Sequence, residues 1–190
     1  MYADRDPARF ARSLPRLAVA HYQDRAVVFW THTMEKRATG WLSDAFHHQF
    51  LELMLHTAAR YDLLCPVYCL MPDHIHLVWL GTSVRSDQRT ATRFLRKHMK
   101  MLLKPAELQR QPHDHVLREE ERVRGAFQST CHYIQENPVR KGLVRRWEDY
   151  PYLDCIMPGY PDVARRNGEF WQHFWHIYEY ILKNDSGRNS

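Results

Sequence analysis

The chain of 190 residues is long enough for one domain with a substantial core. Its formal net charge of +5 is moderately basic, which suits a nucleic-acid partner without requiring one. Its four cysteines lack C-x-x-C pairing, which argues against a disulfide framework or a closed zinc site, and no apolar run approaches the roughly 18 residues of a membrane helix. We therefore expect a cytoplasmic protein without a membrane partner, with one domain over 1–183, a basic arm at 1–24 and a flexible tail at 184–190.

Hydrophobic patterning in the first half of the chain predicts alternating strands and helices. Residues 26–33 are β-branched and aromatic and predict a strand, whereas apolar residues at helical spacing predict a helix over 41–61. Two further strands are expected over 64–71 and 74–80, joined by a turn at Pro72-Asp73. A second helix is expected over 88–103, and a short strand over 115–118.

The second half is expected to hold two more helices. Three glutamates at 119–121 favour the start of a third helix, because they face the positive end of its dipole. Pro138 is expected to end that helix, since the residue before a proline avoids the α region. A packed loop over 150–161 and a last helix over 170–182 should follow. This order predicts an α+β, ferredoxin-like sandwich: an antiparallel sheet of four to five strands with helices packed on one face, plus a C-terminal helix.

The pattern His74-Ile75-His76 opens the strand predicted over 74–80. Side chains two residues apart on a strand point to the same face, so both imidazoles should project side by side and could hold one metal ion. In isolation such a pair is more often structural, with one histidine bonded in the core and the other exposed. Its position beside a turn on a rigid scaffold favours a functional site.

Tyr133 and Asn137 lie four residues apart on the third helix and therefore share a helix face. A tyrosine in an amphipathic helix usually lies at the edge of the core, but Tyr133 is turned about 100° away from the buried stripe that contains Ile134. The amide oxygen of Asn137 and two imidazoles would leave coordination positions open, as in a catalytic site for Mn²⁺ or Mg²⁺. A phenol beside such an ion is a candidate nucleophile, because the ion would polarise a scissile phosphate.

Basic side chains recur every three or four residues along the second helix. No acidic residue lies in this stripe to form i,i+4 pairs, so contact with phosphates explains it better than a merely solvated face. Further basic residues follow the third helix at 140, 141, 145 and 146. The residues expected to contact DNA are Arg93, Arg96, Lys97, Lys100, Lys104 and Arg140.

Together, the segments PDHIHLV at 72–78 and YIQENPVRKGLV at 133–144 resemble the REP-associated tyrosine transposases, a branch of the single-tyrosine HUH transposases. The resemblance implies that His74, His76 and Asn137 bind a divalent ion, Mg²⁺ or Mn²⁺, and that Tyr133 is the nucleophile. It also implies cleavage and rejoining of single-stranded DNA near a hairpin through a 5′-phosphotyrosine intermediate, without a nucleotide cofactor.

The segment before the first strand departs from that family. Members that read REP hairpins tend to carry Arg-Arg and Gly-Gly there, whereas residues 14–22 are LPRLAVAHY, so contacts to a guide sequence are not carried over. A non-catalytic ferredoxin-like module that binds single-stranded nucleic acid is the alternative, although it leaves the histidine pair unexplained. A phosphoesterase with two H-x-T/S motifs is a weaker one, because only H-x-H occurs. The sequence is compatible with a monomer or a homodimer.

Overall fold

The computed structural model describes residues 16–119, 121 and 125–186. A five-stranded antiparallel sheet has the order β4-β1-β3-β2-β5. Four of these strands and two helices follow the βαββαβ order of a ferredoxin-like fold, so the expected fold class is confirmed. The elements are β1 (Val27–Thr33), α1 (Asp44–Arg60), β2 (Leu63–Met71), β3 (His74–Gly81), α2 (Gln88–Leu102), β4 (His113–Val116), α4 (Ala126–Arg140), β5 (Leu153–Ile156) and α5 (Phe170–Ser186).

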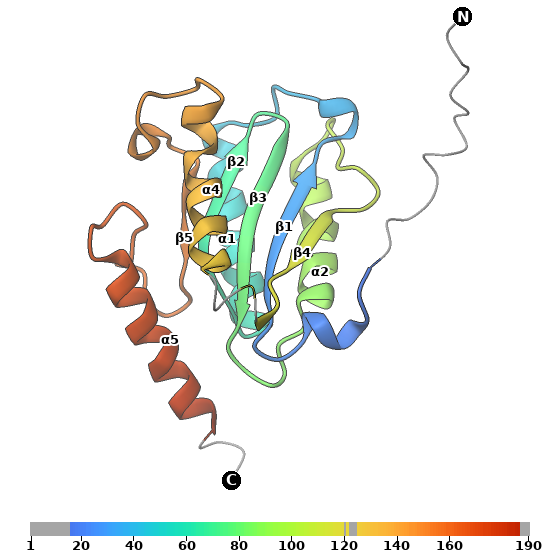
Figure 1. Ribbon diagram of the computed structural model, residues 1–190. Helices are drawn as coiled ribbons and strands as arrows, with labels where there is room; N and C mark the ends of the chain where they lie inside the picture. The colour runs from blue at the N-terminus through green and yellow to red at the C-terminus, as the bar shows by residue number, and fades with distance from the viewer. Residues whose placement is uncertain (1–15, 120, 122–124, 187–190) are drawn as a thin grey trace, which may run out of the picture.

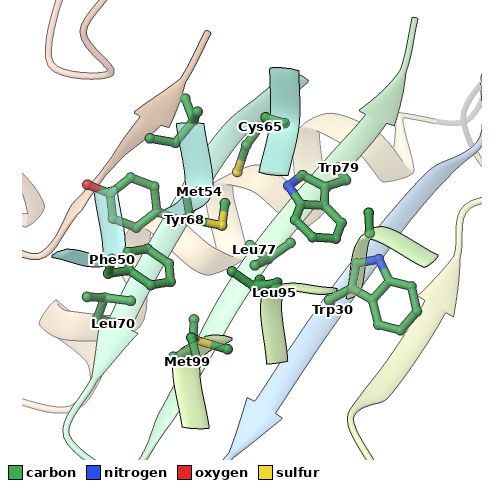
Figure 2. Close-up of a cluster of buried hydrophobic side chains, with 14 of the residues drawn as sticks. Trp30, Phe50, Met54, Cys65, Tyr68, Leu70, Leu77, Trp79, Leu95 and Met99 are labelled. Carbon is green, nitrogen blue, oxygen red and sulfur yellow. The ribbon is translucent and has the colours of Figure 1, made fainter. Parts of the chain in front are cut away.

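The helices α1 and α2 cover one face of the sheet, as expected. Ser43 and Asp87 start them, because each side chain accepts a hydrogen bond from a backbone N–H of the first turn. Alternate residues of β3, Ile75, Leu77 and Trp79, point into this layer. Figure 2 shows the core that results, with Trp30, Phe50, Met54, Cys65, Tyr68, Leu70, Leu77, Trp79, Leu95 and Met99.

The opposite face of the sheet is covered by α4 and α5 (Figure 1). Val78 and Leu80, which alternate along β3 with Leu77 and Trp79, point into this second core. All positions of β2 and β3 are buried, because the sheet has apolar partners on both sides. The expectation that helices pack on one face holds for α1 and α2, whereas the helix that carries Tyr133 lies on the other face.

The end of α4 is set by a glycine, and the expected end at Pro138 is wrong. Pro138 lies inside the helix, which continues to Arg140. Gly142 then adopts a φ of 68°, and the N–H groups of Gly142 and Leu143 bond to the carbonyls of Val139 and Pro138. This pattern satisfies the last carbonyls of a helix and requires a residue that tolerates positive φ. The expected start at 119–121 falls partly outside the described residues.

Other differences from expectation concern short elements and the termini. The predicted loop over 150–161 contains β5, a strand of four residues that extends the sheet beside β2. Short 3-10 helices lie at Val19–Tyr22 (η2), Glu35–Arg37 (η3) and Trp147–Asp149 (η4). α5 continues into the predicted tail, and residues 1–15 of the predicted arm lie outside the described residues. Within the described part of the chain, no helix is both long enough and apolar enough to cross a bilayer.

Candidate functional site

His74 and His76 lie side by side at the start of β3, on the face that α4 covers. Their ring centroids are 4.4 Å apart, and their two Nε2 atoms are 2.9 Å apart. Both residues are buried, with exposed fractions of 8% and 6%. The two imidazoles therefore project side by side from one face of the strand, as their spacing predicts, and their Nε2 atoms converge.

Polar neighbours hold the other ring nitrogens. Nδ1 of His74 lies 2.6 Å from Oδ1 of Asp73, and Nδ1 of His76 lies 2.9 Å from Oγ1 of Thr31. Because a carboxylate only accepts, His74 donates its Nδ1–H to Asp73 and keeps a lone pair on Nε2. The hydroxyl of Thr31 either donates or accepts, so His76 can present an N–H or a lone pair at Nε2. In the described structure, Nε2–H of His76 can donate to Nε2 of His74. In the other tautomer of His76, Nδ1–H donates to Thr31 and the lone pair on Nε2 is available to a cation.

Burial keeps both imidazoles neutral. It lowers the pKa of His76 to about 3, and the charge of His74 adds to this effect. Burial also lowers the pKa of His74, which the hydrogen bond to Asp73 opposes only in part. Metal ions bind the neutral form of histidine, so both nitrogens stay available at a pH where an exposed histidine is already protonated.

The geometry of the pair fits a cation with open coordination positions. Two ligands at right angles, each about 2.1 Å from a small octahedral cation, lie about 3.0 Å apart, which is close to the separation of the two Nε2 atoms. Among the described residues, no three His, Cys, Asp or Glu side chains are grouped to hold a metal ion. A further ligand would therefore be an amide, a hydroxyl, water or a substrate oxygen, which is the donor set of an open site.

The helix α4 and its C-cap residue place Tyr133, Asn137 and Lys141 on one helix face, four residues apart. Tyr133 lies beside His76, with ring centroids 6.0 Å apart, and the charge of Lys141 acts on His74. Asn137 lies between them on that face and is 4% exposed. Its Nδ2 donates to the carbonyl of Tyr133 at 3.1 Å, which leaves Oδ1 as the acceptor that the side chain can offer to a cation.

Tyr133 is accessible from solvent and lies beside the guanidinium of Arg140. The residue is 41% exposed, and its ring lies edge-on to Phe29 with centroids 6.3 Å apart. The guanidinium carbon of Arg140, an exposed residue, lies 4.5 Å from the centroid of the Tyr133 ring. A phosphate that approaches the phenol would therefore meet a positive charge.

The other predicted DNA contacts lie on the opposite layer, on or just after α2. Arg96 is bonded into the fold, because its guanidinium donates to Nδ1 of His32 and to the carbonyls of Gln109 and Arg110. Burial, followed by the charge of Arg16, lowers the pKa of Arg96 to about 10. Four residues of the predicted set are exposed there: Arg93, Lys97, Lys100 and Lys104.

Sequence reasoning missed Thr31 and Asp73, which position the two imidazoles. Asp73 had a local signal, because it directly precedes His74 in the turn between β2 and β3. Thr31 had none, since it meets His76 only through the register in which β1 pairs with β3.

Comparison with known proteins supports the relationship that the motifs indicate. No protein-family model matches the chain. A REP-associated tyrosine transposase of Haemophilus influenzae is 24% identical over 139 residues, which cover 65% of this chain and 76% of that protein. A structure of a REP-associated tyrosine transposase bound to a REP hairpin matches with a TM-score of 0.60 and 21% identity, covering 75% of this chain and 82% of that chain. The structural match shows a shared fold, and both findings confirm the resemblance carried by the two motifs.

Proposed function

We propose that this relative of the REP-associated tyrosine transposases cleaves and rejoins single-stranded DNA through a covalent bond to Tyr133, with a divalent cation, Mn²⁺ or Mg²⁺. The observation that carries the proposal is the convergence of two neutral imidazole nitrogens beside an exposed tyrosine. The expected substrate forms a hairpin, because the structurally similar transposase is bound to one.

Cleavage would transfer a 5′ phosphate from the DNA to the phenol. The oxygen of Tyr133 attacks phosphorus, the bond from phosphorus to the 3′ oxygen breaks, and the phenol loses its proton while the leaving 3′ oxygen gains one. Rejoining is the reverse step, in which a 3′ hydroxyl attacks the phosphotyrosine. Because one phosphodiester is exchanged for another, neither step needs a nucleotide cofactor.

His74, His76 and Asn137 are the residues that would hold the cation. When bound, the cation would draw charge from the scissile phosphate as negative charge develops on its oxygens. Arg140 would act beside Tyr133, where its guanidinium can bind a phosphate oxygen. Both groups would place positive charge where the reaction accumulates negative charge.

The decisive experiment compares two tyrosine variants on a denaturing gel. Wild-type protein with Mn²⁺ should form a covalent adduct with a labelled hairpin oligonucleotide, and Tyr133→Phe should form none while binding the hairpin with unchanged affinity. Tyr152→Phe is the matched control, because its hydroxyl donates to Asp44 away from the site and its loss should leave the adduct intact. An adduct in Tyr133→Phe would place the nucleophile elsewhere.

The same gel tests the alternative of a non-catalytic module that binds single-stranded nucleic acid. Such a module would bind the hairpin in all three proteins and form no adduct in any of them. Wild-type protein treated with a chelator should lose cleavage and keep hairpin binding. Cleavage at full rate after chelation would reject the cation and return His74 and His76 to a structural role.

A further inference from the structure

A recess lined by arginines lies on the layer of α2, away from Tyr133. It has a volume of about 330 Å³ and is bordered by the first half of α2, the segment before β4 and the chain before η2. Among the described residues, no acidic side chain lines it. Its lining includes Arg16, Arg89, Thr92, Arg93, Arg96 and Arg110.

Three of the five arginines are engaged within the fold. Arg16 pairs with Asp114 at 3.2 Å, the guanidinium of Arg89 lies over the ring of Tyr22, and Arg96 donates to the groups described above. The other two, Arg93 and Arg110, are exposed, and their side chains have no ion-pair partner among the described residues. The recess therefore has a wall of three arginines held by the fold, and two exposed arginines without an ion-pair partner among the described residues.

Thr92 adds a donor to this wall. The residue is 3% exposed and lines the recess, yet its Oγ1 is buried without a hydrogen-bond partner among the described residues. A buried hydroxyl that lacks a partner costs free energy, and an oxyanion in the recess would accept its hydrogen bond. The charge of Arg16 also acts on Arg96, and an anion bound in the recess would offset that repulsion.

We propose that this recess binds a backbone phosphate of the hairpin DNA, on the opposite face of the sheet from the phosphate that Tyr133 attacks. The assignment rests on the proposed function, which supplies the DNA. Exposed cations at Lys97, Lys100 and Lys104 continue from the mouth of the recess along α2 and the residues after it. A continuous series of cations suits a polyanion, whereas a free phosphate would need only the recess.

The test measures hairpin affinity as a function of salt concentration for three variants and wild type. Arg110→Gln should weaken binding and reduce the slope of log affinity against log salt by roughly 0.7–0.9, the release of one counterion. Thr92→Val should weaken binding roughly 5-fold, the effect of one lost hydrogen bond. This variant should be at least as stable as wild type, since the hydroxyl of Thr92 has no hydrogen-bond partner among the described residues. Lys183→Gln removes one exposed charge from α5, on the other layer, and should change neither quantity.

Wild-type affinity and slope in both Arg110→Gln and Thr92→Val would overturn the proposal. A second arm uses inorganic phosphate: if it raises the Tm of wild type but not of Thr92→Val, while both bind the hairpin equally, the recess holds a free anion and the assignment to DNA fails. The readout is binding alone, so it is independent of the chemistry. A wild-type protein that forms no adduct would reject the proposed nuclease while the contrast between Arg110→Gln and Lys183→Gln still decides the recess.

Discussion

Thr31 and Asp73 differ in what they allow their histidines to do. Asp73 fixes the tautomer of His74, whereas the hydroxyl of Thr31 accommodates either tautomer of His76. Thr31→Val removes this adjustable partner while keeping a β-branched side chain, and we expect Mn²⁺ affinity to fall by roughly 10-fold or more. Calorimetric titration of Mn²⁺ measures this effect. Thr39→Val, at an exposed position beside α1 and the end of α2 on the other layer, is the control and should titrate like wild type.

His32 should make the stability of the protein depend on pH. It is fully buried on β1, and burial, followed by the charge of Arg96, lowers its pKa well below the usual 6.5. As the pH falls below about 6.5, the unfolded chain takes up this proton and the folded chain does not, so the free energy of unfolding decreases. His32→Asn keeps an acceptor for Arg96 and should flatten the decrease by up to about 1.4 kcal/mol per pH unit.

Urea unfolding of wild type and His32→Asn at pH 7, 6 and 5, without divalent cations, checks this expectation. The variant should have a lower free energy of unfolding at pH 7, because a smaller side chain leaves space in the core. Equal pH slopes in the two proteins would show that His32 is protonated in the folded state and that its burial does not exclude the proton.

At the scale of an element, α2 carries two kinds of basic residue that the sequence pattern does not distinguish. Arg96→Ala should destabilise the protein by about 1–3 kcal/mol, because it leaves a buried acceptor at His32 and a part-buried one at Gln109 without their donor. Lys97→Ala should change stability by less than about 0.5 kcal/mol, because Lys97 is exposed. It should instead reduce the salt slope of hairpin binding by roughly 0.7–0.9. Thermal unfolding and salt titration of both variants would separate the two roles, and an unchanged slope in Lys97→Ala would mark that face as merely solvated.

Local spacing predicted the elements that position the site. The i,i+2 pair at His74 and His76 and the i,i+4 pair at Tyr133 and Asn137 follow from strand and helix periods, which do not depend on the rest of the fold. The end of α4 was mispredicted because a proline signal was weighed above Gly142, which completes the backbone bonds at that end. β5 was missed because four residues flanked by prolines carry too little periodicity to mark a strand.

Tertiary arrangement explains what no local pattern could reveal. The arginine recess draws on three separate segments, at Arg16, α2 and Arg110, and each alone reads as ordinary surface charge. The placement of α4 opposite α1 and α2 depends on which alternate residues of the sheet each helix covers, and β2 and β3 are buried on both faces. The fold class was predictable from element order, whereas the separation of the basic face from Tyr133 was not.

At the scale of the whole molecule, the sheet separates the proposed cleavage site from the proposed phosphate recess. On the sheet face that carries the Tyr133 helix, strands β1 and β4 are less buried than β2 and β3. Phe29 of β1 is half-buried, and His115, its neighbour on β4, is exposed. The recess lies on the other face of the sheet near the same edge, because residues 110–112, which precede β4, line it. A hairpin that contacts both places would therefore pass around the β4 edge of the sheet.

The arrangement of α4 also bears on how many chains form one site. Tyr133 lies beside His76 of its own chain, so one chain contains the nucleophile and both imidazoles. A mixture of Tyr133→Phe and His76→Ala should therefore form no adduct, because neither chain can complete its site with the other's residue. The adduct yield per wild-type chain should also stay constant when the protein is diluted about 100-fold at saturating DNA. If the mixture regains adduct formation, with the DNA attached only to the His76→Ala chain, then α4 serves the histidines of a partner, and the active form is a dimer in which this helix is exchanged.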